Sequence, residues 1–125
     1  MSVLADTSVW IDHLRVGDEL LPGLLDQGSV LSHPWIIGEI ALGHLRDRAD
    51  VLGLLGALPK AVVASDDEVR WLIERGALHG TGIGYVDAQI LASARLTPGA
   101  RIWTRDRRLA GQAARLGRGF DQVAG

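Results

Sequence analysis

The chain has 125 residues, a formal net charge of −2 at pH 7, 47% hydrophobic and 22% charged residues, and no cysteine. This size and composition predict a single globular domain over residues 1–125 with a core of its own. The lack of cysteine excludes disulfides and cysteine-ligated zinc and favours a reducing compartment, the cytoplasm. No apolar stretch approaches the length of a membrane span, so no membrane partner is expected.

Short β-branched runs alternate with longer amphipathic runs. We expect strands over residues 3–5, 30–32, 61–64 and 101–104, and a short final strand over 120–123. Helices are expected over residues 8–15, 19–26 (with a bend near Pro22), 34–45, 49–58 and 66–76. Two further helices are each expected to follow a loop, one within residues 80–96 after its glycine-rich start and one within residues 105–117. This alternation predicts an α/β fold, a three-layer sandwich with a mainly parallel central sheet of four or five strands.

Two acids follow predicted strands. Asp6 comes directly after the first strand, and Asp106 stands two residues beyond the strand at 101–104. Polar sites in parallel sheets lie beyond the carboxyl ends of the strands. Asp6 and Asp106 therefore meet at one edge if their strands are neighbours. The alternative for Asp6 is a helix N-cap and nothing more.

Two further acids stand among apolar residues. Glu39 lies in "WIIGEIALG" and Asp87 in "GIGYVDAQILASA". Carboxylates are rarely buried without a partner, so both are candidates for the same site as Asp6 and Asp106. The alternatives are that Glu39 faces solvent and that Asp87 complements a helix N-terminus.

Gathering these carboxylates is unfavourable without a counter-charge. Two of them about 4 Å apart repel by roughly 4 kcal/mol at an effective dielectric constant near 20. Either one or more of the carboxylates remain protonated, or a cation binds among them. Ligation by carboxylates and water suits Mg²⁺, or Mn²⁺, and not zinc, and such an ion orients a phosphate and activates water. The hydroxyls of Thr7, Ser8 and Thr104 are expected to hold the carboxylates or metal-bound waters, or else to act only as caps and turn formers.

The four acids lie in motifs that resemble a known family. "LADTSVWID", "GEIALG", "GIGYVDAQILASA" and "WTRDRRL" carry Asp6, Glu39, Asp87 and Asp106 in the order of the acidic motifs of PIN-domain ribonucleases, in particular the VapC toxins of bacterial VapBC toxin–antitoxin pairs. The similarity extends over essentially the whole chain. One departure is that Arg107 and Arg108 stand where some PIN domains carry a further acid, which leaves the ligation of a second metal open.

The resemblance implies a parallel sheet flanked by helices and a metal-dependent endoribonuclease. It implies that the four acids form the catalytic and metal-binding pocket, with Asp6 and Asp87 as direct Mg²⁺ ligands. It also implies a homodimer and a cognate VapB-type antitoxin whose tail occupies the acidic groove. Transfer RNA and ribosomal RNA are both plausible substrates, because structured RNA is recognised by shape as well as by unpaired bases.

Arginine supplies nearly all of the positive charge, since Lys60 is the only lysine. Arg105, Arg107 and Arg108 surround Asp106 and are expected to contact RNA phosphates. The alternative is a solvated helix start with weak surface ion pairs. The four tryptophans are expected in the core or in a dimer interface rather than as base-stacking platforms.

Other functions remain open from the sequence. A catalytically inactive PIN-like module that binds RNA or protein would keep the same acids. A haloacid-dehalogenase-like phosphatase also has an acid after its first strand, but it needs a second one where this chain has Ser8, and a placed lysine where only Lys60 is available. The four histidines have no spacing typical of a zinc site.

Overall fold

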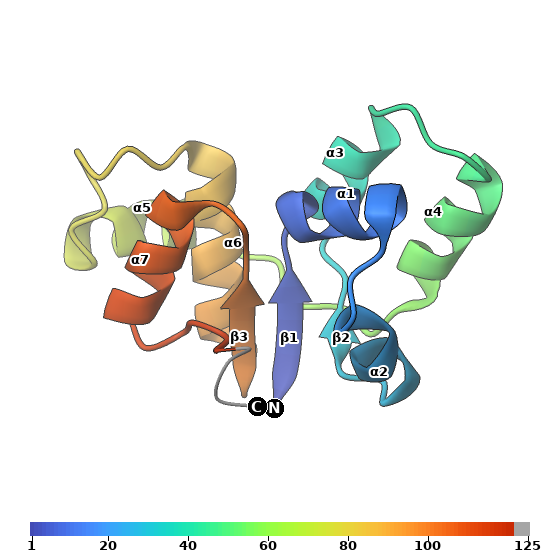
Figure 1. Ribbon diagram of the computed structural model, residues 1–125. Helices are drawn as coiled ribbons and strands as arrows, with labels where there is room; N and C mark the ends of the chain where they lie inside the picture. Colours follow the sequence, from blue (N-terminus) through green and yellow to red (C-terminus); the bar gives the residue numbers. More distant parts are fainter. Residues whose placement is uncertain (122–125) are drawn as a thin grey trace.

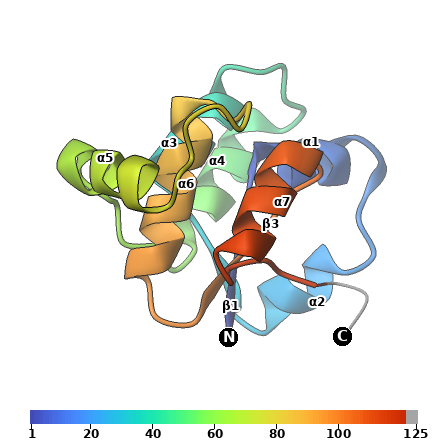
Figure 2. The same ribbon diagram turned by 90° about the vertical axis from the view of Figure 1, so that its left-hand side faces the viewer.

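A small parallel sheet with helices on both faces forms the centre of the molecule in the computed structural model, which describes residues 1–121 (Figure 1 and Figure 2). The sheet has the strand order β2-β1-β3. Its strands are β1 (Ser2–Ala5), β2 (Val30–Leu31) and β3 (Ala100–Trp103). The helices are α1 (Thr7–Val16), α2 (Leu21–Asp26), α3 (Pro34–Ala41), α4 (Arg48–Ala57), α5 (Asp66–Arg75), α6 (Tyr85–Leu96) and α7 (Arg107–Arg115).

The central strand β1 is buried on both faces. Val3, Leu4 and Ala5 have no exposed surface, as expected for a strand that reads as a continuous apolar run. β1 pairs in parallel with β2 on one side and with β3 on the other, where Ala5 lies opposite Trp103. The prediction that the strands before Asp6 and Asp106 are neighbours is therefore confirmed.

The predicted strand over 61–64 is wrong. Ser32 and Lys60 form one isolated parallel bridge, and no strand follows it. The amide of Val62 donates to the hydroxyl of Thr97 at 2.9 Å and that of Ala64 to the hydroxyl of Ser93 at 3.1 Å. Side chains of α6 and its C-cap thus take the backbone hydrogen bonds that a strand partner would have accepted.

The predicted final strand over 120–123 is not formed in the described part of the chain. Ile102 and Gly119 make an isolated bridge, and the amide of Phe120 donates to the carbonyl of Ile102 at 2.9 Å. Residues 122 and 123 of this prediction lie outside the described residues. The sheet in residues 1–121 therefore has three strands rather than four or five.

Proline lies in the first turn of two helices. Pro34 is the first residue of α3, as predicted, whereas α2 begins at Leu21, so Pro22 lies in its first turn and causes no bend. α3 ends at Ala41, earlier than expected. None of the helices in residues 1–121 combines the length and apolar character that a bilayer-spanning segment requires.

A buried polar network joins α3, α6 and the segment after α4. His33 is fully buried, and its Nδ1 accepts from the amide of Trp35 at 3.1 Å, which caps α3. Its Nε2 must then carry the proton and donate to the hydroxyl of Ser93, 2.9 Å away. Ser93 donates in turn to Gln89 at 2.6 Å, and Gln89 donates to the carbonyl of Ala64 at 2.9 Å. The network requires a neutral imidazole.

The network predicts a loss of stability in mild acid. Burial lowers the pKa of His33 below its ordinary value of 6.5, against a weaker opposing effect of Gln89. As the pH falls below about 6.5, the unfolded chain binds a proton at this site and the folded chain does not, so the free energy of unfolding decreases by at most about 1.4 kcal/mol per pH unit. Urea unfolding between about pH 7.5 and 5 measures this slope.

The matched variants are His33→Asn, which keeps a capping acceptor, and His79→Asn at an exposed histidine. The slope should flatten in the first and persist in the second. Equal slopes in wild type and His33→Asn would contradict the prediction.

Candidate functional site

Asp6 lies at the carboxyl end of β1, with only 9% of its surface exposed. Its Oδ1 caps α1 by accepting from the amide of Ser8 at 3.0 Å and from the amide of Val9 at 3.4 Å. Burial raises the pKa of Asp6 above its ordinary value, and its hydrogen bonds oppose that rise. The capping role considered for Asp6 is therefore real, and one carboxylate oxygen performs it.

Two hydroxyls fix the orientation of the Asp6 carboxylate. Ser8 Oγ donates to Oδ1 at 2.5 Å, and Thr104 Oγ1 donates to Oδ2 at 2.5 Å. Thr104 Oγ1 also accepts from the amide of Asp106 at 3.0 Å, and Ser8 Oγ accepts from the amide of Arg105 at 2.9 Å. The loop after β3 is thereby attached to the start of α1.

Glu39 comes to this edge from α3. It is exposed, and its Oε1 accepts from the hydroxyl of Thr7, the first residue of α1, at 2.7 Å. α1 and α3 pack against each other, which keeps these side chains together. Thr7 thus connects the Glu39 carboxylate to the same helix start that Asp6 caps.

Asp87 lies in the first turn of α6 and is partly buried. Its pKa is raised chiefly by burial, and additionally by the negative charges of Asp106, Asp6 and Glu39, against a lowering hydrogen bond from the Gly84 backbone. The fold has therefore brought Asp6, Glu39 and Asp106 within electrostatic range of Asp87. Among residues 1–121, none of the four forms an ion pair.

Asp106 is the N-cap of α7. Its Oδ1 accepts from the amides of Arg108 at 2.8 Å and Leu109 at 3.3 Å. Asp6 and Asp106 thus have the same local role, each capping the helix that follows a strand of the sheet. In Figure 1 the arrowheads of β1 and β3 point to this shared edge, where α1 and α7 begin.

The three arginines near Asp106 lie in different surroundings. Arg105 donates to Asp12 at 3.2 Å and to Asp18 at 2.5 Å, and its guanidinium carbon lies 5.4 Å from the ring centroid of Trp103. Arg107 is exposed. Arg108 extends across the site to the carbonyl of Gly82 at 3.4 Å. An RNA contact by Arg105 would compete with its two carboxylate partners.

Sequence reasoning missed the partners of these arginines. Asp12 ends the motif "LADTSVWID" but has no predicted role, Asp18 belongs to no motif, and the two lie 93 and 87 residues from Arg105 in the chain. Gly82 has φ +88°, and a Cβ at this position would come within 3.0 Å of Arg108 Cδ. The positive φ favours glycine here, and the close approach to the Arg108 side chain restricts the position further.

The carboxylates match a hard cation in donor chemistry. They supply oxygen alone, and no positive side chain is paired with them in residues 1–121. In this range no three Asp, Glu, His or Cys side chains are close enough to form a ready-made metal site. A cation that keeps several of its waters can use such a spread donor set, because water completes its coordination. The residues present therefore fit a partly hydrated divalent ion.

Comparison with known proteins agrees with this arrangement. The model of the PIN domain family matches residues 3–115. The chain is 47% identical over 115 residues to Ribonuclease VapC32 of Mycobacterium tuberculosis (strain CDC 1551 / Oshkosh), which covers 92% of this chain and 93% of that protein. The same values hold for Ribonuclease VapC32 of Mycobacterium tuberculosis (strain ATCC 25618 / H37Rv). The chain therefore belongs to the PIN-domain family and, within it, to the VapC ribonucleases.

Proposed function

We propose that this protein is a metal-dependent endoribonuclease and the toxin of a toxin–antitoxin pair, with its active site at the four acids. The observation that carries the proposal is that the paired strands β1 and β3 end at Asp6 and near Asp106, with Asp87 in the first turn of α6 close enough to interact with the charges of Asp6, Glu39 and Asp106. The names of the two relatives, both ribonucleases, support the reaction class. Membership of the PIN family leaves the phosphatase alternative without support.

In this proposal Asp6 and Asp87 hold a divalent ion directly, and Glu39 and Asp106 complete the site. Mg²⁺, or Mn²⁺ in its place, would orient the scissile phosphate, activate the attacking water and stabilise the leaving oxygen. Ser8 and Thr104 keep Asp6 in place through their hydrogen bonds to its two oxygens. These hydroxyls restrain the carboxylate before substrate arrives, which reduces the cost of ordering the site.

Arg107 and Arg108 are proposed to bind phosphates that flank the scissile bond. Both stand in the first turn of α7, beside Asp106. Their charge offsets the repulsion between an RNA strand and the acidic site. Arg105 is assigned mainly to holding the loop, because its guanidinium is already paired with Asp12 and Asp18.

Family membership further supports a cognate VapB-type antitoxin and a homodimer as partners. A transfer RNA or a ribosomal RNA is the proposed substrate. The cytoplasm is the proposed compartment, since such RNA is present there and the chain has no cysteine to form disulfides.

The first test of the active site is charge removal. Asp6→Asn and Asp87→Asn should each lower the rate of RNA cleavage at least about 100-fold, because each variant removes a ligand to the ion. EDTA should abolish cleavage by the unaltered protein, and added Mg²⁺ or Mn²⁺ should restore it. Gel analysis of end-labelled RNA measures the rates, and Asp26→Asn at an exposed position is the matched control. Cleavage that persists in EDTA, or no cleavage by the folded, antitoxin-free protein, would contradict the proposal.

The second test concerns the support of Asp6. Thr104→Val keeps the shape of the side chain but removes the donor to Asp6 Oδ2 and the acceptor for the Asp106 amide. We expect kcat/KM to fall by about 10- to 100-fold. Thr104→Ser keeps the hydroxyl and should retain most of the activity. If the valine variant cleaves RNA as fast as the serine variant, the hydroxyl has no such role.

The third test concerns the phosphate contacts. Arg107→Ala with Arg108→Ala should weaken RNA binding and flatten the dependence of log K on log salt by about 0.7 for each phosphate that the protein no longer neutralises. Fluorescence anisotropy of a labelled single-stranded RNA measures both. Arg48→Ala with Lys60→Ala removes two positive charges at exposed positions outside the cavity that Glu39 lines and is the control. Equal salt slopes in the two double variants would contradict this assignment.

A further inference from the structure

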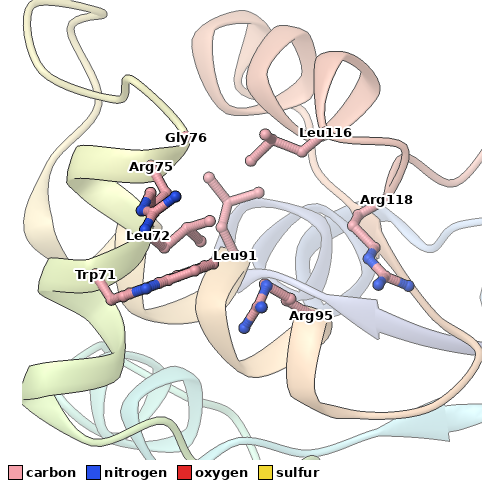
Figure 3. A pocket seen from close by; sticks show the side chains of 8 residues that line it. All are labelled: Trp71, Leu72, Arg75, Gly76, Leu91, Arg95, Leu116 and Arg118. Carbon is pink, nitrogen blue, oxygen red and sulfur yellow. The ribbon is translucent and has the colours of Figure 1, made fainter.

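A second concentration of positive charge lies away from the acids, in a cavity of about 230 Å³ between α5, α6 and the residues after α7. Its lining consists of Trp71, Leu72, Arg75, Gly76, Leu91, Arg95, Leu116 and Arg118. Figure 3 shows the leucines in the middle, Trp71 and Arg75 on the α5 side, Arg118 on the opposite side, and Arg95 projecting from α6. The lining has three guanidinium groups and no carboxylate.

The arginines of this cavity are held in place but not neutralised. The guanidinium carbon of Arg95 lies 4.3 Å from the ring centroid of Trp71, and that of Arg75 lies 5.7 Å from it. Cation–π contact orients a guanidinium while leaving its N–H groups available to an anion. In the part of the chain that the structure describes, Arg75, Arg95 and Arg118 form no ion pair. The carboxylate of Glu68 interacts only weakly with Arg95. The pKa of Glu68 is lowered mainly by its hydrogen bonds with Ser65 and to a small extent by Arg95.

A fourth arginine reaches the rim, where Arg115 donates to the carbonyl of Gly76 at 2.5 Å. This contact is to backbone, so it leaves the positive charge of Arg115 intact. Arginines therefore gather around one cavity in a protein whose net charge is −2.

Trp71 adds a feature that a simple basic surface lacks. Its side chain is 45% exposed, although a tryptophan on an amphipathic helix is expected to be buried. Its ring lies against the guanidinium groups of Arg95 and Arg75, so Trp71 orients these arginines rather than offering a free face for stacking. Arginines held in this way and not paired with a carboxylate can bind the phosphates of a nucleic acid.

We propose that this cavity is a second RNA-binding site, in which Arg95 and Arg118 bind backbone phosphates and Trp71 holds the guanidinium of Arg95 in place. The inference rests on the proposed ribonuclease function, because RNA is its ligand. Asp87 and Arg95 lie on the same helix, eight residues apart, which is about 12 Å along the axis. The two sites are thus close enough to contact one RNA molecule, and the cavity adds to the attraction that Arg107 and Arg108 supply beside the acids.

The test compares two double variants in full-length protein that carries Asp87→Asn, so that RNA stays intact. Arg95→Ala with Arg118→Ala should weaken binding of a labelled single-stranded RNA of about 20 nucleotides roughly tenfold at low salt and reduce the salt slope by about 1.4, the value for two phosphates. Arg48→Ala with Lys60→Ala, at exposed positions outside both cavities, should change the slope much less. Thermal unfolding confirms that each variant is folded. Arg95→Lys with Arg118→Lys keeps the charge and should recover most of the slope.

Three outcomes would overturn the inference. The first is an equal salt slope in the cavity variant and the control. The second is a failure of the lysine pair to recover the slope in a folded protein. The third is that the cavity variant no longer binds a labelled polyglutamate peptide but binds RNA unchanged, which would assign the cavity to an acidic peptide.

Cleavage by protein with the native Asp87 is measured separately. If that protein does not cleave RNA with Mg²⁺ or Mn²⁺, the proposed function fails, whereas the binding slopes still decide the role of the cavity. If it cleaves and the slopes of the two double variants agree, only the cavity proposal fails.

Discussion

The rest of the site depends on one buried anion, the carboxylate of Asp6 at the end of the central strand. Burial disfavours its charge, and hydrogen bonds to Ser8 and Thr104 stabilise it in a fixed orientation. Because Thr104 follows β3 and Ser8 is in α1, the same contacts join two strands and two helix starts at one edge of the sheet. Removing this anion would therefore alter the attachment of the loop after β3 as well as the charge of the site.

Helix capping and the acidic site use the same residues. Asp6 caps α1 and Asp106 caps α7, so partial positive charge from two helix N-termini faces a group of carboxylates. The helix N-termini reduce the electrostatic repulsion among the carboxylates without pairing any of these carboxylates with a positive side chain. The carboxylates stay available to a cation, whereas Asp12 and Asp18 are paired with Arg105 and hold the neighbouring loop. Acids in the same region thus divide between structural and chemical roles according to whether an arginine reaches them.

Charge is distributed unevenly over the molecule. The acids gather at the carboxyl edge of the sheet, and arginines gather around the cavity between α5 and α6. The carboxylates repel RNA until a cation is bound, and arginines outside the acidic group can then supply part of the attraction for a polyanionic substrate. The protein can then carry a net charge of −2 and still offer a local surface that attracts phosphate.

The sequence by itself determined the α/β class and the parallel strands that precede Asp6 and Asp106, and it singled out the four acids as candidates. These features follow from apolar runs and from the rule that polar sites lie at the carboxyl ends of parallel strands, both of which depend on local order in the chain. Only the tertiary structure decided that the amides of Val62 and Ala64 donate to the hydroxyls of Thr97 and Ser93, so that a strand favoured by local propensity is not formed. It likewise decided that Arg105 pairs with Asp12 and Asp18 and that Trp71 stands exposed among arginines. Such contacts join residues far apart in the chain, and their energies depend on distances that arise only when the helices pack.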